Sequence, residues 1–248
     1  MAGHSKWSNI KRRKARVDEQ RGKIFTKLAR EIIVAAREGG GDIDNNFRLR
    51  LAVQKARENN MPNDNIQRAI QRGVGGQEGE SYEQVNYEGY ASGGVAVLLE
   101  ALTDNRNRTA GEIRHHFSRH GGSLGESGCV AWMFERKGFI TVKMEKLSIS
   151  GDDLMMLALE AGADDLQEED DVYNIITSPE LFEEVKNFLQ QHEISIESAE
   201  VTMLPRNTVN ITDPDEARRI LDLMEMLEDN DDVQNVYANF DIPAELMG

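Results

Sequence analysis

The feature that most constrains the fold is an alternation of short apolar strands with amphipathic helices across residues 139–204. The segments are strand Phe139–Lys143, helix Gly151–Ala161, strands Asp165–Glu169 and Val172–Thr177, helix Pro179–His192 and strand Ile194–Leu204. The order β-α-β-β-α-β is the ferredoxin-like pattern. We therefore predict a ferredoxin-like α/β domain over residues 135–206.

The segments on either side of this domain repeat the same pattern if residues 135–206 are treated as an insertion. They are Val95–Ala101 (strand), Asn107–His120 (helix), a short strand near Ser123, Cys129–Phe134 (strand), Pro214–Asp229 (helix) and Val233–Phe240 (strand), with Tyr82–Tyr90 as a further, loosely alternating strand. This arrangement leaves no long structureless loop. It predicts a second ferredoxin-like domain, made of residues 78–134 and 207–248.

Residues 1–77 have a different character and predict a small helical bundle behind a basic arm. The expected helices cover residues 21–38, about 45–58 and 63–72, and glycines follow the first and the third. At about 100° per residue, one side of the first helix is apolar, and Lys23, Lys27, Arg30 and Arg37 lie nearly opposite. In the second helix we expect Phe47, Leu51 and Ala52, or the stem of Lys55, to face inward.

The predicted fold class is therefore α+β, with a three-helix bundle followed by two ferredoxin-like domains, one inserted in the other. The charge is divided along the same boundary. Residues 1–76 hold 17 Lys and Arg against 8 Asp and Glu, a net charge of +9, while the chain as a whole has −15, so the remainder carries −24. A basic unit joined to an acidic body indicates a nucleic-acid partner at one end of the protein.

Several cations that approach a backbone together are what phosphate binding requires. We expect the contacts to come from the arm, the first helix and the third helix: Lys6, Lys11, Arg12, Arg13, Lys14, Arg16, Arg21, Lys23, Lys27, Arg30, Arg68 and Arg72. Arg48, Arg50 and Arg57 would widen the patch. Trp7 either stacks on a base or docks onto the bundle. The alternative is a solvated helix face with a loose tail.

A second group of cations lies in the segment Asp104-Asn105-Arg106-Asn107-Arg108-Thr109, between a strand and a helix. Arg106 and Arg108 near a helix N-terminus would suit a second phosphate site. The alternative is an ordinary strand-to-helix turn in which Asp104 or Asn105 caps the helix.

Nothing in the sequence indicates a catalytic residue, a metal site or a cofactor, and we expect a protein that is not an enzyme. His116 and His120 have metal-ligand spacing without an accompanying carboxylate, and pairs such as Asp231-Asp232 are typical of turns and helix starts. The one cysteine, Cys129, lies in an apolar segment and is expected to be buried. No apolar run is long enough for a membrane span, and no secretory signal is present. We expect a cytoplasmic monomer that does not contact a membrane.

The motifs assembled so far resemble the YebC/PmpR family, whose mitochondrial members act as translational activators. The resemblance is carried by Met1-Ala-Gly-His-Ser-Lys-Trp7, Arg21-Gly-Lys-Ile-Phe-Thr-Lys27, Gly39-Gly-Gly-Asp42, Asn59-Asn-Met-Pro62, Arg72-Gly-Val-Gly-Gly76, Tyr87-Glu-Gly-Tyr90 and Asp104-Asn-Arg-Asn-Arg-Thr109. It implies three domains, a helical one and two of α/β type. It also implies either a DNA-binding transcriptional regulator or a ribosome-associated factor that relieves translational stalling.

Residue types support each of these functions. Gln67, Arg68, Gln71 and Arg72 of the third helix are able to read base edges, which favours DNA. A basic arm with an aromatic residue, next to an acidic body, suits an RNA surface. Tyr82, Tyr87 and Tyr90 are candidate stacking residues on a sheet, although we expect at least one of them to pack into the core. Both possibilities stay open at this point.

Overall fold

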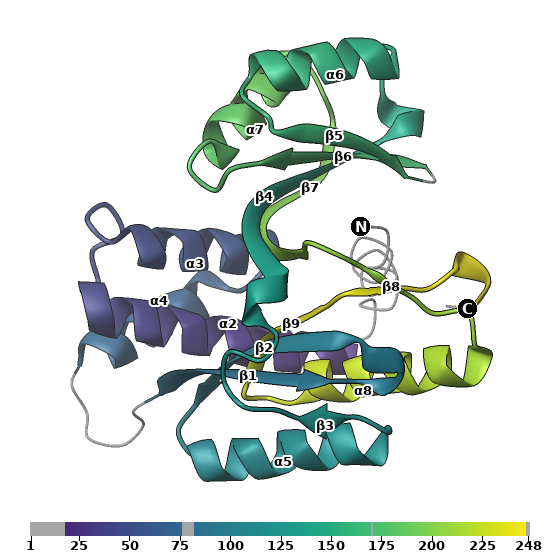
Figure 1. The fold of residues 1–248 in the computed structure, drawn as a ribbon. Helices are drawn as coiled ribbons and strands as arrows, with labels where there is room; N and C mark the ends of the chain where they lie inside the picture. Colours follow the sequence, from purple (N-terminus) through teal and green to yellow (C-terminus); the bar gives the residue numbers. More distant parts are fainter. Residues whose placement is uncertain (1–17, 76–81, 170, 247–248) are drawn as a thin grey trace. The chain divides into compact units, whose positions relative to one another are not determined.

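The computed structural model describes residues 18–75, 82–169 and 171–246 (Figure 1). Trp132–Asn207 forms one compact unit, and the described residues on both sides of it form the other. The predicted α+β class is confirmed, because a group of helices precedes two four-stranded sheets that each carry helices. The finer boundaries, at 77–78, 134–135 and 206–207, stay a prediction.

The first group of helices comprises α2 (Asp18–Gly39), α3 (Phe47–Glu58) and α4 (Asn63–Val74). The start of α3 is fixed by Asn46, whose buried side chain accepts a hydrogen bond from the amide of Leu49 at 3.0 Å and donates to the carbonyls of Ala35 and Gly40, each at 2.8 Å. An N-cap of this kind satisfies amide groups that the helix itself leaves unpaired. The cap therefore ties α3 to the end of α2.

The rotation of α3 differs from the sequence-based expectation. Its buried residues are Leu49, Ala52, Val53 and Ala56. Phe47 and Leu51, which we expected inside, have exposed fractions of 62% and 40%. Small residues at positions 52 and 56 let α3 pack closely, so the helix turns this side inward and leaves its largest side chain, Phe47, outside. Ala52 alone of the expected inward residues is buried.

The sheet of the larger unit has the strand order β3-β1-β2-β9, and all neighbours are antiparallel. Its elements in chain order are β1 (Glu83–Tyr90), β2 (Ala96–Thr103), α5 (Arg106–Arg119), β3 (Ser123–Leu124), α8 (Pro214–Asp229) and β9 (Val233–Ala238). A short parallel pair joins β8 (Val209–Asn210) to β10 (Phe240–Asp241). This is the ferredoxin-like order, with β1 in the place we expected for Cys129–Phe134.

Glu88 explains why the segment before residue 132 is not a strand. Its buried carboxylate accepts hydrogen bonds from the amides of Gly128 (2.6 Å), Val130 (2.7 Å) and Ala131 (2.8 Å). Burial raises the pKa of this carboxyl, but the three amide hydrogen bonds outweigh burial and leave the pKa below its usual value. Amides that bind one carboxylate cannot also pair with a neighbouring strand, so the segment is a loop. Cys129 within it is partly buried, not buried as expected.

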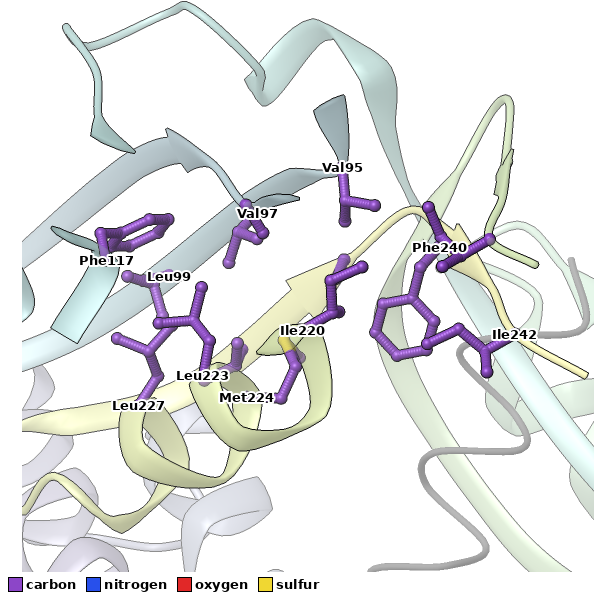
Figure 2. Close-up of a cluster of buried hydrophobic side chains, with 14 of the residues drawn as sticks. Val95, Val97, Leu99, Phe117, Ile220, Leu223, Met224, Leu227, Phe240 and Ile242 are labelled. Carbon is purple, nitrogen blue, oxygen red and sulfur yellow. The ribbon is translucent and has the colours of Figure 1, made fainter. Parts of the chain in front are cut away.

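The core of this unit lies between its sheet and its helices (Figure 2). Val97 and Leu99 of β2 lie close to Leu223 and Leu227 of α8, and Phe117 of α5 lies beside them. All five side chains are fully buried. Their spacing follows directly from the sequence, since a strand points alternate residues to one face and a helix repeats at three to four residues.

The inserted unit has the ferredoxin-like order β5-β6-β4-β7, with all neighbours antiparallel. Its elements are β4 (Phe134–Lys143), α6 (Gly151–Glu160), β5 (Asp165–Glu169), β6 (Val172–Thr177), α7 (Phe182–Gln191) and β7 (Ile196–Pro205). Both helices lie on one side of this sheet (Figure 1). β4 begins five residues earlier than the predicted Phe139. Within the described ranges, no helix is long and apolar enough to cross a membrane.

Candidate nucleic-acid interface

The residues predicted to bind phosphate fall into four groups, and the first lies outside the described residues. It consists of the arm residues Lys6, Trp7, Lys11, Arg12, Arg13, Lys14 and Arg16. Arg21 lies within α2, whose described backbone begins at Asp18. The arm therefore precedes α2 directly in the chain, and its contacts with phosphate stay a prediction.

The second group, the basic stripe of α2, faces acidic residues of the same unit. The acidic corner, which we define as Glu228–Asp232, joins the end of α8 to β9. Nζ of Lys23 lies 3.2 Å from the carboxylate of Asp229, and Nζ of Lys27 donates to the backbone carbonyl of Glu228. The stripe that the helical phase predicts is present, but the protein's own acidic corner contacts it.

Asp232 is the centre of this contact and is almost completely buried, with 3% of its surface exposed. One carboxylate oxygen accepts a hydrogen bond from Arg30 at 2.8 Å. The other accepts from Arg108 and Thr109, each at 2.7 Å, and from Thr103 at 3.2 Å. Arg30 and Arg108, from separate parts of the sequence-predicted site, thus meet on one carboxylate.

The ionisation of Asp232 reflects two opposing effects. Burial raises the pKa of its carboxyl, whereas hydrogen bonds from Arg108 and Thr109 and the charges of Arg108 and Arg30 lower it. The second effect prevails, so the pKa lies below its ordinary value. The carboxylate is ionised at neutral pH and balances part of the charge of both arginines.

The third group is the start of α5. The side chain of Asn105 accepts a hydrogen bond from the amide of Arg108 at 3.1 Å and caps the helix, as the turn alternative expected. The guanidinium of Arg108 also lies 2.7 Å from the Asp104 carboxylate. The Arg106 side chain is 65% exposed and lies 3.9 Å from Glu83. Arg106 is therefore more available than Arg108 to contact a phosphate at this turn.

The fourth group is on α3 and α4, where cations face solvent. Between Phe47 and Val74 the chain has six Lys and Arg against two acidic residues, Glu58 and Asp64. Four of the six are exposed arginines: Arg50 and Arg57 on α3, and Arg68 and Arg72 on α4. Gln67 and Gln71 are exposed next to the latter pair. The surface of α3 and α4 therefore combines solvent exposure with an excess of positive charge.

The tyrosines considered for base stacking lie against protein groups instead. Tyr82 is partly buried, with the Arg30 guanidinium 5.3 Å from its ring centroid. Tyr87 packs against the core of the larger unit, and Tyr90 donates its hydroxyl hydrogen to the carbonyl of Cys129 at 3.1 Å. All three rings are partly buried, Tyr87 packs against the core as we expected for at least one of them, and base stacking on these tyrosines stays a prediction.

Sequence reasoning missed the role of Asp232, which organises this region, and the exposure of Phe47. No local pattern in the sequence links Asp232 to Arg30, which lies 202 residues away in the chain. The exposure of Phe47 has a detectable signal, since Leu49, Ala52, Val53 and Ala56 form an equally regular apolar face. Within residues 18–75, 82–169 and 171–246, no group of three or more His, Cys, Asp or Glu side chains is arranged to hold a metal ion.

Comparison with known protein families identifies the family of this chain. Residues 5–76 match the model of the TACO1/YebC protein N-terminal domain, and residues 82–240 match the model of the TACO1/YebC second and third domain. The chain belongs to the TACO1/YebC family. The two matches are separated only by residues 77–81.

Members of the TACO1/YebC family resemble this chain over nearly its full length. A probable transcriptional regulatory protein of Natranaerobius thermophilus is 59% identical and covers 100% of this chain and 99% of its own length. One of the same description from Desulfitobacterium hafniense is 57% identical, with 97% and 96% covered. The crystal structure of a conserved hypothetical protein of Aquifex aeolicus is 51% identical, has a TM-score of 0.82 and covers 95% of this chain and 96% of its own.

Proposed function

We propose that this TACO1/YebC protein is a nucleic-acid-binding regulator of gene expression that contacts phosphates through its basic N-terminal unit. The names of its relatives describe probable transcriptional regulation. The observation that carries the proposal is the set of exposed arginines on α3 and α4, in a segment whose net charge is +9 beside a body of −24. A polyanion responds to the local potential and not to the overall charge of the protein.

The contacts of α2 refine which predicted residues take part. Arg30 and Arg108 share a buried carboxylate, so a phosphate would have to displace Asp232 to reach either guanidinium fully. Lys23 has an exposed partner, Asp229, and an exposed ion pair is weak and easily exchanged. We assign direct phosphate contact chiefly to the arm, Arg68, Arg72 and Arg106, and a mainly structural role to Arg30 and Arg108.

For a DNA-binding regulator, the relevant surface is α4. Gln67, Arg68, Gln71 and Arg72 are exposed, and their spacing places them on one side of the helix. Arginine and glutamine are the side chains that hydrogen-bond guanine and adenine edges in a major groove. A ribosome- or RNA-associated translation factor is the second candidate. It is favoured by the acidic body, which would limit nonspecific contact on an RNA-rich surface.

Replacement of both Arg68 and Arg72 by glutamine tests the phosphate contacts. We expect weaker binding to nucleic acid and a log–log salt dependence that is shallower by roughly 1.4–1.8, because each lost contact removes about 0.7–0.9 from the slope. Fluorescence anisotropy of a labelled oligonucleotide across a salt series measures both quantities. The matched control is the double variant Lys143→Gln and Lys146→Gln, which removes the same charge from the inserted unit. Equal effects of the two variants would contradict the assignment.

The choice between DNA and RNA needs a measurement in cells. Crosslinking of the protein to its bound nucleic acid, followed by sequencing, identifies the partner directly. Recovery of promoter DNA supports the transcriptional regulator, and recovery of ribosomal or transfer RNA supports the translation factor.

A further inference from the structure

Phe47 is an aromatic side chain that the structure leaves in solvent. Its exposed fraction is 62%, and that of Leu51, one helical turn further along α3, is 40%. At about 100° per residue, Phe47 and Leu51 lie within about 40° of each other, on the side of α3 opposite the buried Ala52 and Ala56. An exposed phenylalanine forgoes the free energy that burial of a ring would provide. A ligand that covers the ring would recover it.

Cations lie along both flanks of this exposed stripe. On one flank Arg48 pairs with Glu38, and Lys55 lies 3.7 Å from Glu31. Both acidic partners belong to α2, so this flank is largely neutralised within the bundle.

The other flank of the stripe carries Arg50 and Arg57, which are seven residues apart and therefore lie on the same side of α3. Both are exposed. The Arg50 guanidinium lies 5.6 Å from the centroid of the Phe47 ring and donates a hydrogen bond to the carbonyl of Asp44 at 3.2 Å. The hydrogen bond holds the positive charge over one face of the Phe47 ring, so a base would have to stack on the opposite face.

We propose that the face of the Phe47 ring opposite Arg50 is a stacking platform for an unpaired nucleobase of single-stranded nucleic acid, with the Arg50 charge close by to attract the adjoining phosphate. The proposal rests on the proposed nucleic-acid function and specifies the form of the ligand. An aromatic side chain beside cations is how proteins bind single strands with little sequence preference, since every base has a π-face. A base within a duplex is already stacked on both sides and offers no such face.

The charge around the ring favours a nucleic acid over a protein as the occupant. From Phe47 to Val74 the net charge is +4, so the occupant should be negative. A purely apolar protein partner would need contact area but no aromatic ring, and leucine at position 47 would serve it nearly as well. A stacked base requires the ring itself. This difference makes the two occupants distinguishable.

The test measures anisotropy with two labelled probes, an oligouridylate of about 20 nucleotides, longer than the site of one single-strand-binding domain, and a DNA duplex of equal length. The variants are Phe47→Ala, Phe47→Leu and Phe47→Trp, with Leu51→Ala as the matched control on the same exposed face. We expect the alanine and leucine variants to bind the single strand roughly 5- to 150-fold more weakly, the range found for loss of one stacked base. Their salt slopes should be unchanged, because no phosphate contact is lost. The tryptophan variant and the control should bind as the unaltered protein does, and binding to the duplex should not change.

Three outcomes overturn the stacking assignment. One is wild-type affinity of both the alanine and leucine variants, and another is wild-type affinity of the leucine variant alone, which would indicate an apolar contact that does not require an aromatic ring. The third is an equal loss on single strand and duplex. If the Arg68 and Arg72 double variant still flattens the salt slope in these cases, the proposed function stands and only stacking fails. If the unaltered protein binds neither probe, the proposed function fails with it.

Discussion

Replacement of Asp232 by alanine should lower the free energy of unfolding of the larger unit by roughly 3–5 kcal/mol. Arg30, whose side chain is only 16% exposed, would lose the carboxylate that pairs with its charge, whereas Arg108 would keep Asp104. Thr103 and Thr109 would each lose a hydrogen-bond acceptor. Removal of one member of a buried ion pair leaves the other charge desolvated, which costs far more than the loss of a surface pair. Urea denaturation followed by circular dichroism measures the change.

The neighbouring residue supplies a matched control for this substitution. Asp231 is exposed, and Arg30 contacts its backbone carbonyl, which remains in the alanine variant. Asp231→Ala should therefore change the free energy of unfolding by less than about 0.5 kcal/mol. Similar losses for Asp231→Ala and Asp232→Ala would show that the acidic corner acts only through its overall charge.

The lowered pKa of Asp232 also determines how its contribution to the stability of the fold depends on pH. A carboxyl whose pKa is lower in the folded than in the unfolded state stabilises the fold at pH values above its unfolded pKa, and this stabilisation is lost as the pH falls through the folded pKa. The difference in stability between the protein and its Asp232→Ala variant should thus be constant near neutrality. It should shrink only below about pH 4, where an unperturbed aspartate protonates.

Replacement of all six arm cations by glutamine should have the largest effect on nucleic-acid binding. The residues are Lys6, Lys11, Arg12, Arg13, Lys14 and Arg16. If each contacts one phosphate, the log–log salt slope should become shallower by about 4 for a single strand and about 5 for a duplex, since a contact contributes roughly 0.7 or 0.9. Anisotropy titrations between low and moderate salt measure the slope.

The inserted unit provides a control of identical charge change for the arm variant. It also holds six Lys and Arg, namely Arg136, Lys137, Lys143, Lys146, Lys186 and Arg206. Their joint replacement by glutamine lowers the net charge by the same amount, and circular dichroism verifies that this variant is folded. Only the arm variant should flatten the slope. A comparable change in both would attribute binding to the net charge and not to the arm.

Most of the fold follows from local patterns in the sequence. Strands β5 and β6 and helix α8 begin and end at the predicted residues, because polar turns and a proline delimit them. In the other ferredoxin-like unit, the prediction of a strand over Cys129–Phe134 was wrong. That apolar segment resembles a strand, but the buried carboxylate of Glu88 engages its amides, a contact between residues about 40 positions apart. Periodicity carries no information on such long-range hydrogen bonds.

The candidate site was predictable as a charge pattern but not as a geometry. The helical phase correctly placed Lys23, Lys27 and Arg30 on one side of α2, yet it gave no sign that an acidic corner some 200 residues away contacts that side. In α3 the choice of the largest apolar residues as the inward face was wrong. Close helix packing favoured the small Ala52 and Ala56, and the ring of Phe47 was left to solvent. In both places, the contacts of the helix depend on the surface that packs against it, which the residue pattern does not reveal.

The central claim is that nucleic acid binds chiefly to the basic N-terminal unit, to which Arg106 of α5 adds a single contact. The most direct test is to irradiate the complete protein bound to nucleic acid with ultraviolet light, digest it and identify the crosslinked peptides by mass spectrometry. We predict that crosslinks concentrate in residues 1–75, on the arm and on α3 and α4. Crosslinks confined to residues 82–248 would contradict the claim.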